Sequence, residues 1–263
     1  MPSYTDHPIV FFDPQAHTVP LTTILAGLQS ACAAALSRFG LTTLLIPCFV
    51  RHLPVSSALS LWHSPDFQAA FTSSDNVKAA PNGSCAGIGL DSSELPFPPS
   101  LFKDIWAEAK AKGIHRTMHA GEEGGPERVE ASLDLGCERI DHGIRMAEDP
   151  ALMSRVAAEK TLVTVCPLSN VALKCVKSVS EVPIKTFLEQ GVRFSVNSDD
   201  PAYFGGFVLD NYCAVQEAFG LSKGDWVKIC EGAIEGSWCG EGRKGEMRGL
   251  LREVVEEFGG LEA

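Results

Sequence analysis

Short apolar runs alternate with longer segments of helical spacing along the whole chain. From Leu21 to Phe39, apolar side chains recur every three or four residues until Gly40, which predicts an amphipathic helix. Residues 161–166 are apolar and β-branched, as expected for a parallel strand covered on both faces. Asp149-Pro150 predicts a helix start, because aspartate caps a first turn and proline tolerates that position.

The same criteria predict about seven strands, most of them followed by a helix. The predicted strands are residues 8–12, 41–50, 85–90, 113–118, 139–143, 161–166 and 192–197. The predicted helices are residues 21–39, 56–71, 127–135, 151–160 and 184–190, one that starts at Pro98-Pro99 with Leu101 on its apolar face, and a helical region over 207–258 with Gly220 as a stop and Ser222 as a cap.

This alternation predicts an α/β fold with a parallel sheet. Neither a dinucleotide-binding nor a phosphate-binding glycine loop follows the first strand, so a TIM-type (β/α)8 barrel fits better than an open sheet. Such a barrel has eight strands, and the first predicted strand already begins at residue 8. We therefore expect a single domain over residues 1–263: an incomplete barrel whose first strand is missing, with a helical C-terminal segment. The stretch 73–84 predicts a surface loop.

Composition and charge indicate which partners and which cellular compartment to expect. The formal charge of −11 argues against a nucleic-acid polymer, whose phosphates need a basic surface. Nine cysteines without paired short spacings indicate a reducing, intracellular compartment. We find neither a signal segment nor an apolar run of membrane-spanning length, so we expect a soluble cytoplasmic protein, with the nucleus as an alternative and no membrane partner.

Polar residues follow several predicted strands, and the ends of parallel barrel strands meet at one face. They are Ser92 after the third strand, His119 and Glu122 at the fourth, His142 at the fifth, Ser169-Asn170 at the sixth and Asp199-Asp200 at the last. Histidine and aspartate are ligands of catalytic zinc, which activates water. Glu122 would then be a general acid, and His142 or Asp199 would orient or deprotonate the water. Taken singly, Asp199-Asp200-Pro201 and Ser169-Asn170 also suit turns, and His142 a core histidine.

Four motifs in this order resemble the adenosine/adenine deaminase family of the amidohydrolase superfamily, and within it most closely the fungal adenine deaminases. They are His119-Ala120-Gly121-Glu122, Arg139-Ile140-Asp141-His142-Gly143, Cys166-Pro167-Leu168-Ser169-Asn170 and Ser198-Asp199-Asp200-Pro201. Gly89-Leu90-Asp91-Ser92-Ser93-Glu94 adds to the resemblance, which covers nearly the whole chain.

The resemblance implies a function and a set of site residues. His119 and Asp199 would be ligands of one Zn²⁺, Glu122 the proton donor and His142 a catalytic residue beside the activated water. Asp200 would bind the purine, and Ser92 would touch the edge of the base. The implied reaction is hydrolytic deamination of adenine to hypoxanthine and ammonia, a step of purine salvage, so the expected partner is a small purine base.

One departure from the family keeps alternatives open. The family has a His-x-His pair of zinc ligands on its first strand, and this sequence contains no His-x-His. His7 and His17 flank what resembles the second strand and cannot replace that pair. The alternatives are a deaminase of adenosine or another aminopurine, an inactive fragment or pseudoenzyme, and a barrel metallohydrolase acting on another amide or amidine. We expect His52, His63 and His115 to be surface or packing residues, and the sequence does not indicate the oligomeric state.

Overall fold

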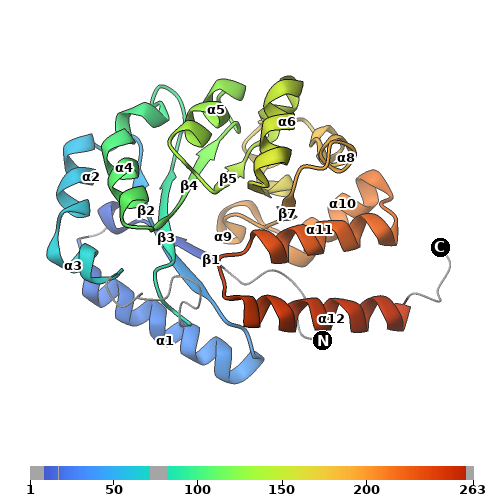
Figure 1. Cartoon of the computed structure of the whole chain (residues 1–263), viewed down its shortest axis with the longest axis horizontal. Helices are drawn as coiled ribbons and strands as arrows, with labels where there is room; N and C mark the ends of the chain where they lie inside the picture. The colour runs from blue at the N-terminus through green and yellow to red at the C-terminus, as the bar shows by residue number, and fades with distance from the viewer. Residues whose placement is uncertain (1–8, 17, 72–81, 259–263) are drawn as a thin grey trace.

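Seven parallel strands form a curled sheet in which each strand pairs with the next one in the sequence, as a computed structural model of the chain shows (Figure 1). The structure describes residues 9–16, 18–71 and 82–258. Within these residues β1 pairs with β2 alone and β7 with β6 alone, so the incomplete barrel predicted from the sequence is confirmed. The strands are β1 (Ile9–Phe12), β2 (Leu44–Val50), β3 (Gly87–Asp91), β4 (His115–Ala120), β5 (Arg139–His142), β6 (Leu162–Val165) and β7 (Phe194–Val196).

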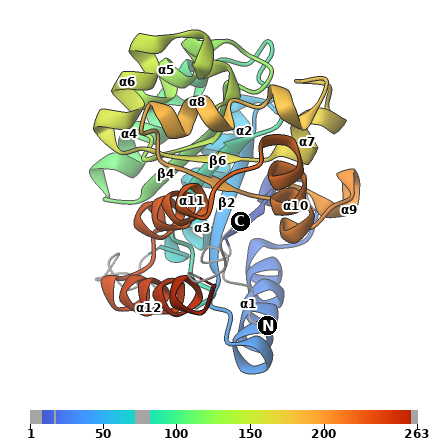
Figure 2. The same cartoon turned by 90° about the vertical axis from the view of Figure 1, so that its right-hand side faces the viewer.

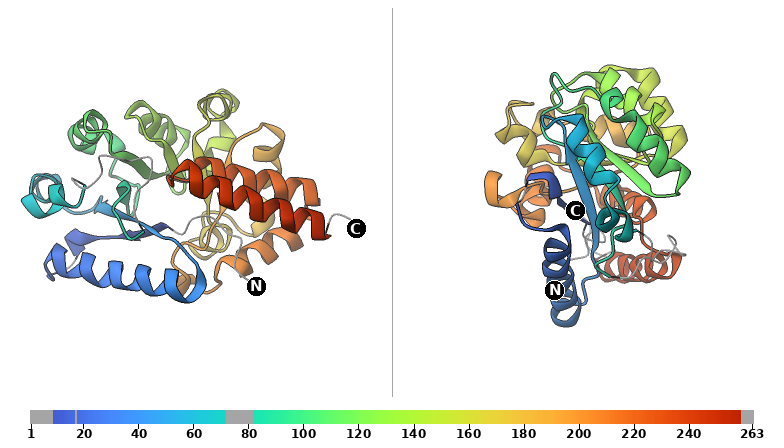
Figure 3. Two further views of the ribbon diagram at one scale, coloured as in Figure 1. Left: turned by 60° about the horizontal axis from the view of Figure 1, so that its bottom comes forward. Right: turned by 90° about the vertical axis from the view of Figure 1, so that its left-hand side faces the viewer.

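Helices follow the strands and cover the outside of the curled sheet (Figures 1 and 2). They are α1 (Leu21–Phe39), α2 (Val55–Trp62), α3 (Pro65–Ala69), α4 (Lys103–Ala111), α5 (Pro126–Asp134), α6 (Pro150–Glu159), α7 (Pro167–Ala172), α8 (Ile184–Glu189), α9 (Pro201–Phe204), α10 (Val208–Phe219), α11 (Lys223–Gly236) and α12 (Glu241–Phe258). Short 3-10 helices are η1 (Pro14–Ala16), η3 (Pro99–Phe102), η4 (Ile144–Glu148) and η5 (Val179–Glu181). Helix α12 runs beside α11, at the opposite end of the sheet from α1 (Figure 3).

Strand β2 shows why the sheet forms here, because all seven of its residues are buried. Leu44, Ile46 and Cys48 alternate along it and pack inside the curl against Ala86 and Trp238. Leu45 and Phe49 belong instead to the main core that includes the helices. Both faces of the strand are therefore covered, as expected for a parallel strand.

Several predicted helix boundaries are confirmed. Helix α1 covers the predicted range and ends at Gly40, which is in the left-handed conformation. Asp149 caps α6 through its side chain, and Ser222 caps α11. The predicted helix over residues 56–71 is wrong, however, because it is two helices. Pro65 lacks the N–H that a continuous helix would need, and the Ser64 hydroxyl accepts a bond from the Phe67 backbone N–H to start α3.

Two predicted apolar faces are only partly covered. Cys32 of α1 is buried, but Leu36 and Phe39 are 42% and 61% exposed, because α1 follows the edge strand of the sheet. Leu101, predicted on the apolar face of the helix after Pro98, is 45% exposed. The chain there first forms the 3-10 helix η3, with three residues per turn, so Leu101 leaves the face that Phe102 and Ile105 bury.

Six of the nine cysteines are buried, in agreement with their position in apolar runs. His7, His17 and most of the predicted loop over 73–84 lie outside the described residues. Among the described helices, none has the length and apolar character needed to cross a membrane.

Candidate active site

Three predicted site residues lie together where the strands end. His119 lies in β4, His142 ends β5 and Asp199 follows β7. One ligand atom from each of these residues lies within 4.8 Å of those of the other two. The two imidazole rings have centroids 4.8 Å apart. Residues far apart in the sequence therefore form one cluster of metal-ligating side chains.

The backbone is strained at three predicted site residues. The φ angle is +70° at Ser92, +67° at His142 and +54° at Asp199. Residues other than glycine rarely adopt this left-handed region, and such strain is concentrated at functional sites. The conformations support a functional role for these positions.

Glu122 lies beside the cluster, with 7% of its surface exposed. Its Oε1 atom lies 3.2 Å from His142 Nδ1 and accepts a hydrogen bond of 2.9 Å from the Asn170 side chain. Burial raises the pKa of Glu122, and the charge of Asp199 raises it further, although His142 and Asn170 act in the opposite direction. A carboxyl group with a raised pKa keeps its proton closer to neutral pH, which suits a proton donor.

The two histidines have different electrostatic surroundings. Burial, together with the neighbouring charges of His142 and Arg51, lowers the pKa of His119 to about 3, so its imidazole is neutral at neutral pH. Burial alone would lower the pKa of His142 as well, but Glu122, Asp199 and nearby carboxylates raise it above its ordinary value. A neutral imidazole is the form that binds a metal.

The remaining predicted residues lie at the edge of the cluster. Asp199 accepts a hydrogen bond of 2.5 Å from the buried Ser169 hydroxyl. Asp200 is exposed, and partial burial followed by the charge of Asp199 raises its pKa. The Ser92 hydroxyl lies 2.7 Å from Nδ1 of the exposed His52. His52 is exposed, as expected for a surface residue, but its ring also contacts Ser92, a candidate site residue.

Sequence reasoning missed a buried carboxylate under the cluster. Asp141 is 3% exposed and accepts hydrogen bonds of 2.6 Å from the hydroxyls of Thr117 and Thr164. Its Oδ2 atom lies 3.7 Å from His119 Nδ1. The register pairs His119 with Asp141 across β4 and β5, so alternation along these two strands could have indicated this neighbour.

A second group with acidic side chains lies at the ends of β1 to β3. Asp13, Cys48 and Asp91 each place one polar side-chain atom within 4.8 Å of the others. Burial, and then a hydrogen bond to Asp13 and its charge, raise the pKa of Asp91 to about 9. Asp91 therefore keeps its proton at neutral pH beside the carboxyl group of Asp13.

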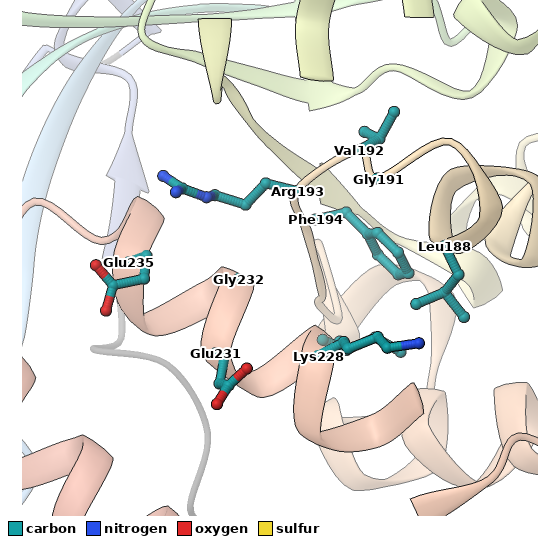
Figure 4. A pocket seen from close by; sticks show the side chains of 10 residues that line it. Leu188, Gly191, Val192, Arg193, Phe194, Lys228, Glu231, Gly232 and Glu235 are labelled. Carbon is teal, nitrogen blue, oxygen red and sulfur yellow. The ribbon is translucent and has the colours of Figure 1, made fainter. Parts of the chain in front are cut away.

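A shallow groove of about 310 Å³ lies elsewhere on the molecule (Figure 4). Its walls come from Gly191–Arg193, just before β7, and from α11, including Lys228 and Glu231. Asp199 follows β7 at the strand's other end, so this groove is separate from the histidine cluster.

The residues of the cluster suit a zinc ion. One ligand atom each from His119, His142 and Asp199 converges within 4.8 Å, and the His119 imidazole is neutral at neutral pH. Two histidines and an aspartate are typical ligands of a catalytic zinc, which keeps another position open for water. The cluster therefore fits such an ion although the sequence contains no His-x-His pair.

An incomplete parallel barrel with a histidine and aspartate cluster at its strand ends defines a hydrolase of the amidohydrolase type. The family model for adenosine deaminase matches residues 5–256. The chain belongs to the adenosine deaminase family.

Individual relatives agree with this assignment. The chain is 50% identical over 253 residues to an adenine deaminase of Aspergillus oryzae, a match covering 95% of this chain and 70% of the relative. A crystal structure of adenine deaminase from Arthrobacter aurescens superposes with a TM-score of 0.85 at 38% identity, covering 94% of this chain and 73% of that one. A Burkholderia ambifaria amidohydrolase with bound Zn has a TM-score of 0.84 at 25% identity, covering 95% of this chain and 68% of that one.

Proposed function

We propose that this chain catalyses the zinc-dependent hydrolytic deamination of adenine to hypoxanthine and ammonia. The observation that carries the proposal is the cluster of His119, His142 and Asp199 with Glu122 Oε1 3.2 Å from His142 Nδ1. The adenine deaminase named among its relatives is 50% identical over nearly the whole chain and supports this choice of substrate.

His119 and Asp199 would hold the zinc ion, and His142 would lie beside it as a catalytic residue. Bound zinc would make a water molecule nucleophilic near neutral pH. The zinc in the amidohydrolase relative supports this choice of metal.

The protein's own side chains would move the protons. Glu122 would donate a proton to the ring nitrogen next to C6 of adenine while water adds at that carbon. His142 lies beside Glu122 and would accept the proton of the water. His142 would then pass that proton to the exocyclic nitrogen, and Glu122 would regain one from the added hydroxyl. The bond from C6 to the exocyclic nitrogen breaks, ammonia leaves, and the oxygen of water remains as the carbonyl of hypoxanthine. Asp200 and Ser92 would contact the edges of the base.

Ammonia release from adenine by the zinc-loaded chain tests the proposal, with adenosine as the competing substrate. We expect adenine to be preferred, and Glu122→Gln to lower kcat by roughly 10²–10⁴-fold at unchanged zinc content. Glu130→Gln, an exposed glutamate on α5, is the matched control and should retain full activity.

The outcomes separate the alternatives. Stoichiometric zinc without ammonia release from any aminopurine would identify an inactive member of the family. A higher kcat/KM for adenosine would make the nucleoside the substrate. Full activity of Glu122→Gln would contradict the proton-donor role.

A further inference from the structure

Two loops beside the candidate site are joined by reciprocal hydrogen bonds. One is the loop after β3, which contains Ser93 and Glu94, and the other is the turn after β4, which contains Gly121, Glu122 and Glu123. We call these bonds the loop clamp. The proposed proton donor, Glu122, lies at the centre of the second loop.

Glu94 provides the larger part of the clamp. Its carboxylate is 1% exposed and accepts three backbone N–H bonds, from Gly121 at 2.9 Å, Glu122 at 2.7 Å and Glu123 at 3.0 Å. Bonds from backbone N–H groups to a buried carboxylate are charge-assisted and stronger than neutral ones. One side chain thus fixes three successive peptide groups.

Glu123 completes the clamp in the opposite direction. Its Oε2 atom accepts a bond of 2.7 Å from the Ser93 hydroxyl and one of 3.0 Å from the Glu94 backbone N–H. Each loop therefore donates to a carboxylate of the other. Gly124 allows the close approach, since a Cβ atom there would lie 2.9 Å from Glu94 Oε2.

Arg51 balances the buried charge of Glu94. It is 1% exposed, and the opposite charge of Glu94 raises its pKa, although burial has the larger effect and lowers that pKa to about 10. Its guanidinium donates to the backbone carbonyls of Phe97, at 3.0 Å, and of His119. The same charged pair therefore contacts the backbone of both His119 and Glu122.

We propose that Glu94 is a positioning residue that holds the Glu122 carboxyl in its place beside His142 through the backbone of residues 121–123. Glu94 itself bonds to the backbone of the turn, and Glu122 Oε1 is placed 3.2 Å from His142 Nδ1. This role rests on the proposed function as far as Glu122 acts as the proton donor. A proton donor displaced by about 1 Å loses about 10²-fold in rate.

The test compares Glu94→Gln with the wild-type chain by hydrogen–deuterium exchange without substrate and by steady-state kinetics. The neutral amide keeps the size of glutamate but replaces one acceptor oxygen with a donor. We expect the amides of residues 121–123 to exchange at least about tenfold faster. We expect kcat to fall about 10–100-fold, while KM and zinc content stay within about twofold.

Glu123→Ala is a second variant, because its side chain is exposed and its loss removes the smaller part of the clamp. It should accelerate exchange at the amide of Glu94, whose N–H bonds to Glu123, with a smaller loss of kcat. Glu130→Gln again serves as the control and should change neither measurement.

Exchange at residues 121–123 that is unaffected in Glu94→Gln would overturn the proposal, as would faster exchange with unchanged kcat. If Glu94→Gln fails to fold, Glu94→Asp takes its place, because its shorter carboxylate cannot reach all three N–H groups, and unchanged exchange at residues 121–123 or an unchanged kcat would overturn the proposal. Because exchange is measured without substrate, a chain without deaminase activity would refute the proposed function and still leave the exchange result readable.

Discussion

The interior of the curled sheet has two unlike halves. On β2 and before β3 it is apolar, where Leu44, Ile46, Cys48 and Ala86 pack with Trp238. On β4 to β6 it is polar, where Asp141 accepts bonds from Thr117 and Thr164 beneath His119. The apolar half is stable only if its side chains have complementary shapes and pack closely. In the polar half, every buried hydrogen-bond donor and acceptor needs a partner.

This difference suggests that the halves have separate tasks. The apolar half should contribute mainly to the free energy of unfolding, and the polar half mainly to the affinity for a metal. Substitutions in each half can test that separation, because stability and metal affinity are measured independently.

The largest effect is expected in the apolar half, from Trp238→Ala. Trp238 is 6% exposed, stacks on His115 with ring centroids 4.7 Å apart, and lies under the Arg139 guanidinium at 4.4 Å. A Cβ atom on Gly87 would lie 2.7 Å from its ring, so the indole fills its space tightly. We expect the free energy of unfolding to fall by about 3–5 kcal/mol in denaturant titrations. A tenfold loss of zinc affinity in the folded variant would contradict the separation.

In the polar half, Asp141→Asn should lower the affinity for zinc by about 10–100-fold, since it removes the carboxylate that lies 3.7 Å from His119 Nδ1. Asparagine has the same shape and can still bond with both threonine hydroxyls, so the free energy of unfolding should change little. Competition with a chromophoric chelator measures the affinity. Unchanged affinity would show that Asp141 is only a packing residue.

An effect that is smaller for each pH unit concerns the exception in the apolar half, Asp91 beside Asp13. The pKa of Asp91 is about 9 in the folded chain and near its ordinary low value after unfolding. Between these values the folded state holds a proton that the unfolded state has lost. The free energy of unfolding therefore falls as the pH rises, by up to about 1.4 kcal/mol per pH unit.

Asp91→Asn should remove this slope. Denaturant titrations between about pH 5 and about pH 8 compare the two proteins, and the variant should gain stability over wild type as the pH increases. Parallel curves would show that Asp91 does not carry the extra proton.

The smallest effect is expected for Ile46→Val, which removes one methyl group from the apolar half. The free energy of unfolding should fall by about 0.5–1.5 kcal/mol, with zinc affinity unchanged. A change in zinc affinity from so small a substitution would mean that the two halves are coupled.

The sequence predicted the strands and their ends because those depend on local patterns. Residues 161–166 were apolar enough to predict β6, and His119, His142 and Asp199 each lay at or just after the end of a predicted strand. The break between α2 and α3 was missed because the apolar spacing continues through Pro65. There the chemistry of one residue outweighs periodicity.

The supporting residues were harder to predict because their roles depend on contacts across the sheet. Glu94 appeared only as the last residue of a motif, and Arg51 was not singled out at all. Their significance lies in bonds to the backbone of another loop, which leave no spacing pattern in the sequence. Asp141 alone had such a signal, through its register opposite His119.

The left-handed backbone at His142 and Asp199 lowers the stability of the folded chain to heat. Glycine adopts that conformation without steric penalty, so His142→Gly or Asp199→Gly would relax the main chain and at the same time delete a metal-ligating group. Random mutagenesis with selection for heat resistance alone would therefore tend to replace these site residues. A screen that selects for catalysis and heat resistance together is the appropriate way to engineer this protein.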